Sequence, residues 1–464
     1  MHRFLICRGP SSLLFKSAVY SLKALGKSFF CCHLVEIKMN AILLLLLLSV
    51  ALTINADDTL DTSSIRPHRH AKASKAKTTK NGKSTEEDET PPDGAAGCLY
   101  VGTSEKKYGA KIQQLCFDEY GNKVSGPMNF DESGDATKSY STSFAYQADS
   151  SNPNVFYSSL KNGILWQCSK ETANSCGTWE TVINAWATSM IFGPPDVMYA
   201  GLARNSFMWK CPMQASNQCQ TINIGYTVLS LAYDEDSQTV YAGVGVNPGA
   251  GVMIYKIDSN NNVSEFASIP TGGVSTVNVN NLELVGNILW VSYATVTADC
   301  GLEGICTGGG IIYCDITSGS CHFIIGNKPF WGITYSPDQN MVYAEQVSFQ
   351  SIGSTSGYIY WFNPSSPSNY GIYVGLGEMG NGFVADDLSN PAFPPNAFQY
   401  GGGYLWIGTG TCKDSSCSSV FQCPAEGTPI SMSSCTKLWR LNCNKSTNVE
   451  GTCLGAQSLI YIEN

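Results

Sequence analysis

The sequence repeats a short aromatic motif seven times along most of its length. Each copy places one aromatic residue among apolar residues, as in Val240-Tyr241-Ala242-Gly243. The seven aromatic residues, here called the anchors, are Tyr100, Tyr157, Tyr199, Tyr241, Trp290, Tyr343 and Trp406, at spacings of 57, 42, 42, 49, 53 and 63 residues. A repeat of this length cannot bury its apolar face alone, so neighbouring repeats must pack against one another.

Each repeat contains further short apolar segments that are typical of β-strands. A second strand follows the anchor, as in 164–166 and 358–360, and another apolar segment precedes most anchors, as in 229–233. No sustained helical period of 3.6 residues is present, whereas four short strands per repeat are typical of a β-propeller blade. We therefore predict an all-β fold, a seven-bladed β-propeller with four-stranded antiparallel blades over residues 98–464.

The two ends of this region predict how the ring closes. The first repeat has no strand before its anchor, while the chain ends with a spare apolar segment at 458–462. We expect this C-terminal strand to enter the first blade and close the ring, because an open seam would leave unpaired strand edges.

Sixteen cysteines lie in residues 98–464, and they are close together in pairs. The nearest pairs are Cys98 with Cys116, Cys168 with Cys176, Cys211 with Cys219, Cys300 with Cys306, Cys314 with Cys321, Cys412 with Cys417, Cys423 with Cys435, and Cys443 with Cys453. None has the CxxC spacing of a zinc ribbon, and histidine is scarce. Because Cys168 and Cys176 flank a turn between two predicted strands, a disulfide between the strands is expected. The sequence predicts disulfide-stapled blades in an oxidising compartment, although spacing alone leaves other connectivities open.

The N-terminal region predicts export. Residues 42–54 form a 13-residue apolar run, which is too short to span a bilayer but suits a signal peptide ending at Ala56. Few apolar residues follow, so the next segment is predicted to be disordered. The predicted segments are a basic leader or untranslated extension (1–38, with Met1 or Met39 as the start), a signal peptide (39–56) and a disordered charged linker (57–97). A mitochondrial transit peptide and a retained membrane anchor are alternatives for the leader.

Charge and histidine content exclude several function classes. Residues 1–97 hold 13 of the 28 basic and 9 of the 37 acidic residues, which leaves 15 and 28 in 98–464, a formal net charge of −13. Such a charge repels nucleic acid. His322 is the one histidine beyond residue 70, so a catalytic triad or a multi-histidine metal site lacks candidates. With no GxSxG, Walker A or HExxH motif either, we expect no catalytic residue.

One group of polar residues is a candidate metal site. It comprises Asn280, Asn281, Glu345, Asn381, Asp386 and Asp387, near strands expected to face the ring axis. In residue type this group resembles the ligand set of calcium-dependent lactonase-type propellers, and calcium prefers such oxygen ligands. The resemblance implies a calcium-dependent hydrolase with Glu345, Asn281, Asp386 and Asp387 as candidate ligands. The simpler interpretation is that these are turn and edge residues and that the protein has no cofactor.

Three further features bear on function. The sequons Asn262-Val-Ser264 and Asn444-Lys-Ser446 predict N-glycosylation at Asn262 and Asn444. Asp258-Ser-Asn-Asn-Asn262 begins like a calcium loop but lacks its glycine and its final glutamate, so a hairpin turn is expected. Four tryptophans fall outside the repeat positions and make a carbohydrate-binding, lectin-like propeller a further alternative: Trp179, Trp186, Trp331 and Trp361.

These observations together predict a secreted, extracellular binding or matrix module, with the calcium-dependent hydrolase and the lectin-like propeller as alternatives. Its expected partner is an extracellular protein or glycan. Contact with a membrane is expected only if the leader is retained as an anchor.

Overall fold

The first strand of the chain begins at Gly97, the last residue of the predicted linker. The computed structural model describes residues 94–105, 109–132, 141–160, 162–181, 185–194, 196–213, 218–246, 251–271, 276–296, 308–346, 358–375, 397–408, 419–440 and 454–464. The predicted leader and signal peptide, and the linker up to residue 93, lie outside them. The described residues contain the strands β1 to β28 and a short 3₁₀ helix, Met432–Ser434. No helix among them is long and apolar enough to cross a membrane.

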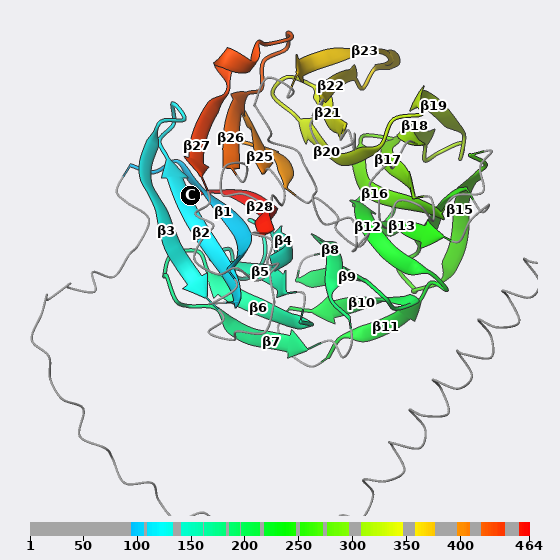
Figure 1. Cartoon of the computed structure of the whole chain (residues 1–464). Coiled ribbons are helices and arrows are strands. Elements are labelled where there is room, and N and C mark those ends of the chain that lie inside the picture. The colour runs from blue at the N-terminus through cyan, green and yellow to red at the C-terminus, as the bar shows by residue number, and fades with distance from the viewer. Residues whose placement is uncertain are drawn as a thin grey trace, which may run out of the picture. The chain divides into compact units, whose positions relative to one another are not determined.

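The strands form antiparallel sheets arranged around a ring (Figure 1). Sheet A contains β28 (Leu454–Glu463), β1 (Gly97–Glu105), β2 (Gly109–Phe117) and β3 (Lys123–Glu132). Sheet B contains β4 (Ser141–Tyr146), β5 (Val155–Leu160), β6 (Ile164–Ser169) and β7 (Gly177–Thr181), and sheet C contains β8 (Ala187–Phe192), β9 (Val197–Leu202), β10 (Phe207–Pro212) and β11 (Gln220–Asn223).

The remaining strands form sheets D, E and F. Sheet D contains β12 (Thr227–Asp234), β13 (Thr239–Val246), β14 (Val252–Ile257), β15 (Val263–Ile269), β16 (Thr276–Val285), β17 (Ile288–Val296), β18 (Gly308–Asp315) and β19 (Cys321–Gly326). Sheet E contains β20 (Phe330–Ser336), β21 (Met341–Gln346), β22 (Tyr358–Asn363) and β23 (Ser366–Gly375), and sheet F contains β24 (Phe398–Gly401), β25 (Tyr404–Gly408), β26 (Ser419–Pro424) and β27 (Thr436–Arg440).

The all-β propeller with four-stranded antiparallel blades is confirmed, but sheet D corrects the predicted count of seven separate blades. The described strands form five four-stranded sheets and one eight-stranded sheet. The two halves of sheet D, here D1 (β12–β15) and D2 (β16–β19), are joined because β13 pairs with β16 at Gly245↔Asn278 and Val246↔Val277. The sequence repeat does not indicate this pairing, because it depends on how close two strand ends lie in space.

The C-terminal strand β28 pairs with the first strand of the chain. The register runs antiparallel from Gly97↔Glu463 to Gly102↔Ser458, and the sheet order is β28-β1-β2-β3. The side chains of Leu99 and Val101 on β1 are fully buried. The first and last described strands therefore share one sheet, and Figure 1 shows β28 on the side of β1 nearer the middle of the ring.

Hydrogen bonds of one kind cross successive junctions between the sheets. The inner strands β4, β8, β12 and β16 each contain a register shift. A side chain beside the shift donates to a carbonyl of the next inner strand: Thr142 to Ala187 (2.7 Å), Thr188 to Val228 (2.7 Å), Ser230 to Val279 (3.0 Å) and Asn280 to Phe330 (2.8 Å). These repeated bonds satisfy buried polar groups, and near the middle of the ring they connect neighbouring sheets and, through Ser230, the two halves of sheet D.

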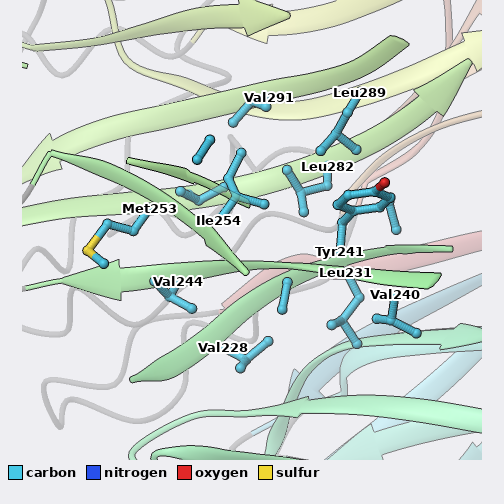
Figure 2. Close-up of a cluster of buried hydrophobic side chains, with 14 of the residues drawn as sticks. Val228, Leu231, Val240, Tyr241, Val244, Met253, Ile254, Leu282, Leu289 and Val291 are labelled. Carbon is cyan, nitrogen blue, oxygen red and sulfur yellow. The ribbon is translucent and has the colours of Figure 1, made fainter. Parts of the chain in front are cut away.

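The seven anchors fill the space between sheets. Their exposed fractions are 0 to 4%, as expected for residues that hold neighbouring sheets together. Figure 2 shows one such region, where Tyr241 lies with Leu231 and Val240 beside Leu282 and Leu289. The first three come from D1 and the last two from D2, so this part of the core lies between the two halves of sheet D.

Five of the eight predicted cysteine pairs are disulfides in the structure. They are Cys98–Cys116, Cys168–Cys176, Cys211–Cys219, Cys314–Cys321 and Cys423–Cys435. Cys98 and Cys116 are directly opposite each other on β1 and β2, and Cys314 and Cys321 on β18 and β19. Each of these two bonds therefore joins neighbouring strands of one sheet, as the sequence predicts for such pairs.

The three other predicted disulfides fall on residues outside the described ranges. They are the pair of Cys300 with Cys306, the pair of Cys412 with Cys417, and the pair of Cys443 with Cys453. These three pairs therefore stay predictions.

Candidate functional site

The residues predicted near the ring axis are only partly described. Asn280 and Asn281 lie on β16, and Glu345 lies on β21. Asn381, Asp386 and Asp387 lie outside the described residues. The described residues contain no group of three or more His, Cys, Asp or Glu side chains that could hold a metal ion. The calcium site therefore stays a prediction.

Two members of this group have surroundings that suit a structural role. The Asn280 amide donates to the Phe330 carbonyl and so belongs to the bonds that tie the sheets together. Glu345 is 2% exposed, and burial raises the pKa of its carboxyl to about 8. The cause of this shift is the removal of the carboxyl from water, which disfavours its charged form.

The calcium-like segment 258–262 is a hairpin turn between β14 and β15, as predicted. The Asp258 carboxylate accepts hydrogen bonds from the backbone N–H groups of Asn260 and Asn262 and from the Asn262 side-chain amide. These bonds lower the pKa of Asp258. Asp118 makes the same three types of contact in the β2–β3 turn, which indicates a repeated turn device rather than a metal loop. The sequon residue Asn262 is exposed in this turn, while Asn444 lies outside the described residues.

The histidine candidate and two of the four tryptophan candidates lie against other aromatic or cationic groups. His322 on β19 stacks on Tyr313, with ring centroids 5.1 Å apart. Trp179 and Trp186 are buried, and the Arg204 guanidinium lies 4.9 Å from the Trp186 ring. Trp331 and Trp361 are partly buried. No fully exposed tryptophan face is available among these four for stacking on a sugar.

A pocket of about 310 Å³ lies at the junction of sheets B and C. Sheet B provides the β4–β5 turn with Ser151 and Asn152, and the side chains of Tyr157 and Gln167. Sheet C provides Phe192, Asp196 and Met213. We call this site the B–C pocket. Its volume lies at the small end of the range for ligand pockets, which is about 300–1,000 Å³.

Asp196 is held in place from both sheets that form the B–C pocket. Its Oδ1 accepts hydrogen bonds from the Ser151 N–H at 2.8 Å and from the Ser151 hydroxyl at 2.7 Å. Its carbonyl accepts from the Met213 N–H at 2.8 Å. Asp196 has a positive φ of 63°, a conformation that Asp and Asn tolerate better than most residues. The carboxylate is thus positioned by the fold before any ligand binds.

Tyr157 provides a buried hydroxyl to the same pocket. The side chain is 3% exposed, and its hydroxyl accepts a hydrogen bond from the Gln167 amide at 2.9 Å. Burial raises the pKa of Tyr157 to about 12, and the nearby Asp196 carboxylate also raises it, while the bond from Gln167 lowers it. The hydroxyl therefore keeps its proton at physiological pH and can donate a hydrogen bond.

The sequence does not identify this pocket. The repeat assigns Tyr157 to packing, and no pattern singles out Ser151, Gln167 or Asp196. One signal is visible once the strand registers are known: Gln167 is directly opposite Tyr157 on the neighbouring strand, as Gln114 is opposite Tyr100. The pocket itself depends on the spacing between two sheets, which the sequence does not show.

Comparisons with known proteins find similar solved structures but no family. No protein-family model matches the sequence, and no curated protein matches it. Among solved structures, the chain is similar to a putative 6-phosphogluconolactonase from Bacteroides uniformis, at 12% identity and a TM-score of 0.49, over 79% of this chain and 99% of that one. It is also similar to the β-propeller domain of Cps50 (Swd1) from Myceliophteria thermophila, at 10% identity and 0.39, over 77% and 100%. A chain of a nidogen/laminin complex matches at 11% and 0.40, over 59% and 91%.

Proposed function

We propose that this chain is a secreted β-propeller that acts as an extracellular binding or matrix module. The observation that carries the proposal is the set of five disulfides. Such bonds persist in oxidising compartments and are rare in cytosolic proteins. The predicted signal peptide at 39–56 is an independent feature that supports export. A rigid ring that presents turns on both of its faces is suited to binding.

The finer architecture that we propose is a ring of seven four-stranded units, with D1 and D2 as two of them and β28 as the closing strand. Three contacts support it. The Ser230–Val279 bond connects D1 to D2 in the manner of the neighbouring junctions. Ser458 on β28 contacts Ser141 of sheet B at 2.8 Å, and the Tyr461 N–H donates to the Gln399 side chain of sheet F at 3.0 Å.

The proposed partner is an extracellular protein or glycan. The net charge of −13 over residues 98–464 disfavours nucleic acid and other polyanions. The proposed module works without a cofactor, and it contacts a membrane only if the leader is retained as an anchor.

Expression in cultured eukaryotic cells tests the proposed secretion. Two versions are compared, one starting at Met1 and one at Met39, and the medium and cell fractions are analysed by non-reducing electrophoresis and thiol alkylation. We expect protein in the medium with its described cysteine pairs oxidised. Asn262→Gln should remove one N-glycan, and the control Asn260→Gln, in the same turn but outside the sequon, should not. Protein that stays in the cytosol with free thiols would contradict the proposal.

A binding experiment tests the proposed module. The purified, secreted protein is incubated with intact cells and with extracellular matrix from which the cells have been removed. Saturable binding that competes with unlabelled protein is expected, and it should be lost after reduction of the disulfides. The proposal fails if the protein is secreted but binds neither preparation above the level of a reduced and alkylated sample.

A further inference from the structure

Two anchors make the same contact with a glutamine but differ in their second partner. The Tyr100 hydroxyl accepts from the Gln114 amide at 2.9 Å and donates to the Lys170 carbonyl of sheet B at 2.9 Å. The Tyr157 hydroxyl accepts from Gln167 in the same way. Among the described residues, however, no acceptor receives its proton, and Tyr157 lines the B–C pocket together with its partner Gln167.

The difference arises in the neighbouring sheet. Lys170 lies two residues after the disulfide cysteine Cys168 of sheet B, and Met213 occupies the matching position after Cys211 of sheet C. The N–H groups of these two residues are bonded alike, Lys170 to the Asn154 carbonyl and Met213 to the Asp196 carbonyl, each at 2.8 Å. The difference is that the Lys170 carbonyl accepts a hydrogen bond from the Tyr100 hydroxyl, whereas Met213 lines the B–C pocket. A buried donor is thus left facing a pocket at one junction and is satisfied by protein at the other.

The pocket's chemistry limits its ligand. It contains no Lys or Arg among its lining residues, so it offers nothing to a phosphate or sulfate group. One carboxylate, from Asp196, is too few for a calcium ion, which takes six to eight oxygen ligands. The other polar groups are neutral hydroxyls and amides, including Asn152 and Gln167, and Phe192 adds an apolar surface. This combination suits a small ring that carries several hydroxyl groups and has an apolar face.

We infer that the B–C pocket binds one sugar unit of an extracellular glycan, with the Tyr157 hydroxyl donating and the Asp196 carboxylate accepting hydrogen bonds from neighbouring sugar hydroxyls. This inference rests on the proposed extracellular binding function and names the class of ligand. It differs from the lectin-like alternative based on the tryptophans, because none of those four residues lines this pocket.

Saturation-transfer NMR of the secreted protein tests the inference. The probes are free glucose, galactose, mannose, fucose and N-acetylglucosamine, each at millimolar concentration. At least one sugar should receive saturation, and its affinity should fall about tenfold in Tyr157→Phe, the loss expected from one hydrogen bond in a pocket. Asp196→Asn should also weaken binding. Tyr100→Phe is the matched control, because its hydroxyl is bonded to protein, and it should leave sugar affinity unchanged.

The outcomes separate this inference from the proposed function. No saturation transfer to any of the five sugars overturns the pocket assignment, even where the protein is secreted and binds cells or matrix. Transfer that is equal in wild type and Tyr157→Phe, or weakened equally by Tyr100→Phe, also overturns it. A failure of secretion or of matrix binding would instead count against the proposed function.

Discussion

The A–B and B–C junctions are built from the same sequence pattern but end differently. In both, an anchor tyrosine accepts a hydrogen bond from a glutamine directly opposite it on the next strand. At the A–B junction the Tyr100 hydroxyl continues to the Lys170 carbonyl of the next sheet. At the B–C junction the Tyr157 hydroxyl meets a pocket of about 310 Å³.

This difference shows that the repeat specifies packing while single turns specify a site. The buried rings of Tyr100 and Tyr157 hold the sheets in similar ways, with exposed fractions of 1% and 3%. The two hydroxyls have different surroundings because the turns of the neighbouring sheets differ. A propeller can therefore open a pocket at one junction without changing the repeated core.

Removing β28 should have the largest effect on stability, and it acts on sheet A and the A–B junction. Deletion of residues 454–464 exposes the fully buried Leu99 and Val101 and removes the Ser458 contact with sheet B. The expected loss is comparable to the entire stability of a typical domain, roughly 5–15 kcal/mol. Thermal melting and secretion both measure it, and we expect neither a cooperative transition nor secreted protein.

The matched control for that deletion is a shorter one. Removing Glu463 and Asn464 alone keeps most of the β28–β1 register and should preserve cooperative melting. A protein without 454–464 that melts cooperatively near the wild-type temperature would show that β28 is dispensable, and the proposed closure would be wrong.

Glu345 is a buried acid that lies beside an anchor, and its effect on stability depends on pH. Glu345 lies two residues from the anchor Tyr343 on β21, so the two side chains share a face of the strand. Burial raises the pKa of Glu345 in the folded state from 4.5 to about 8. The free energy of unfolding therefore has its full value below about pH 4.5, and it falls as the pH rises towards 8 because the unfolded chain can ionise this carboxyl more easily than the folded one.

The variant Glu345→Gln should remove this loss. Wild type and variant should differ little at pH 4.5, and the variant should be more stable by roughly 3–5 kcal/mol at pH 9, from about 1.4 kcal/mol per unit of pKa. Urea unfolding at several pH values measures the difference. Burial also raises the pKa of Glu283 to about 8, so the stability of both proteins depends on pH. Subtracting the stability of wild type from that of the variant isolates the contribution of Glu345. Stability curves that run parallel from pH 4.5 to 9 would contradict this account of Glu345.

Much of the fold could be predicted from the sequence, and little of the candidate site could. The anchors and the paired cysteines recur at similar intervals, so the propeller, the blade pattern and five disulfides followed from spacing. The joined sheet D did not, because the Gly245↔Asn278 pairing depends on geometry between two repeats. Asp196 could not be recognised either, since its partner Ser151 is 45 residues away and belongs to a different sheet.

Tyr100→Phe should have the next largest effect. It leaves the Lys170 carbonyl without this donor and removes the acceptor of the Gln114 amide, and Gln114 is 2% exposed. An unsatisfied buried polar group costs about 1–3 kcal/mol. Urea unfolding at neutral pH measures the loss in the free energy of unfolding. A loss within error of zero would show that the stability of the A–B junction does not depend on the Tyr100 hydroxyl.

Tyr157→Phe should have the smallest effect on stability, and this result decides the comparison. The substitution keeps the ring that packs 5.2 Å from Trp179. It removes no donor from any described carbonyl, and the partly exposed Gln167 amide can bond to water in the pocket. We therefore expect a loss of about 0.5 kcal/mol or less, below the cost of an orphaned buried group. Equal losses in Tyr157→Phe and Tyr100→Phe would mean that the two junctions are energetically alike. A small loss at Tyr157 and a large one at Tyr100 would mean that the hydroxyl at the B–C junction contributes little to stability, as expected of a group beside a pocket.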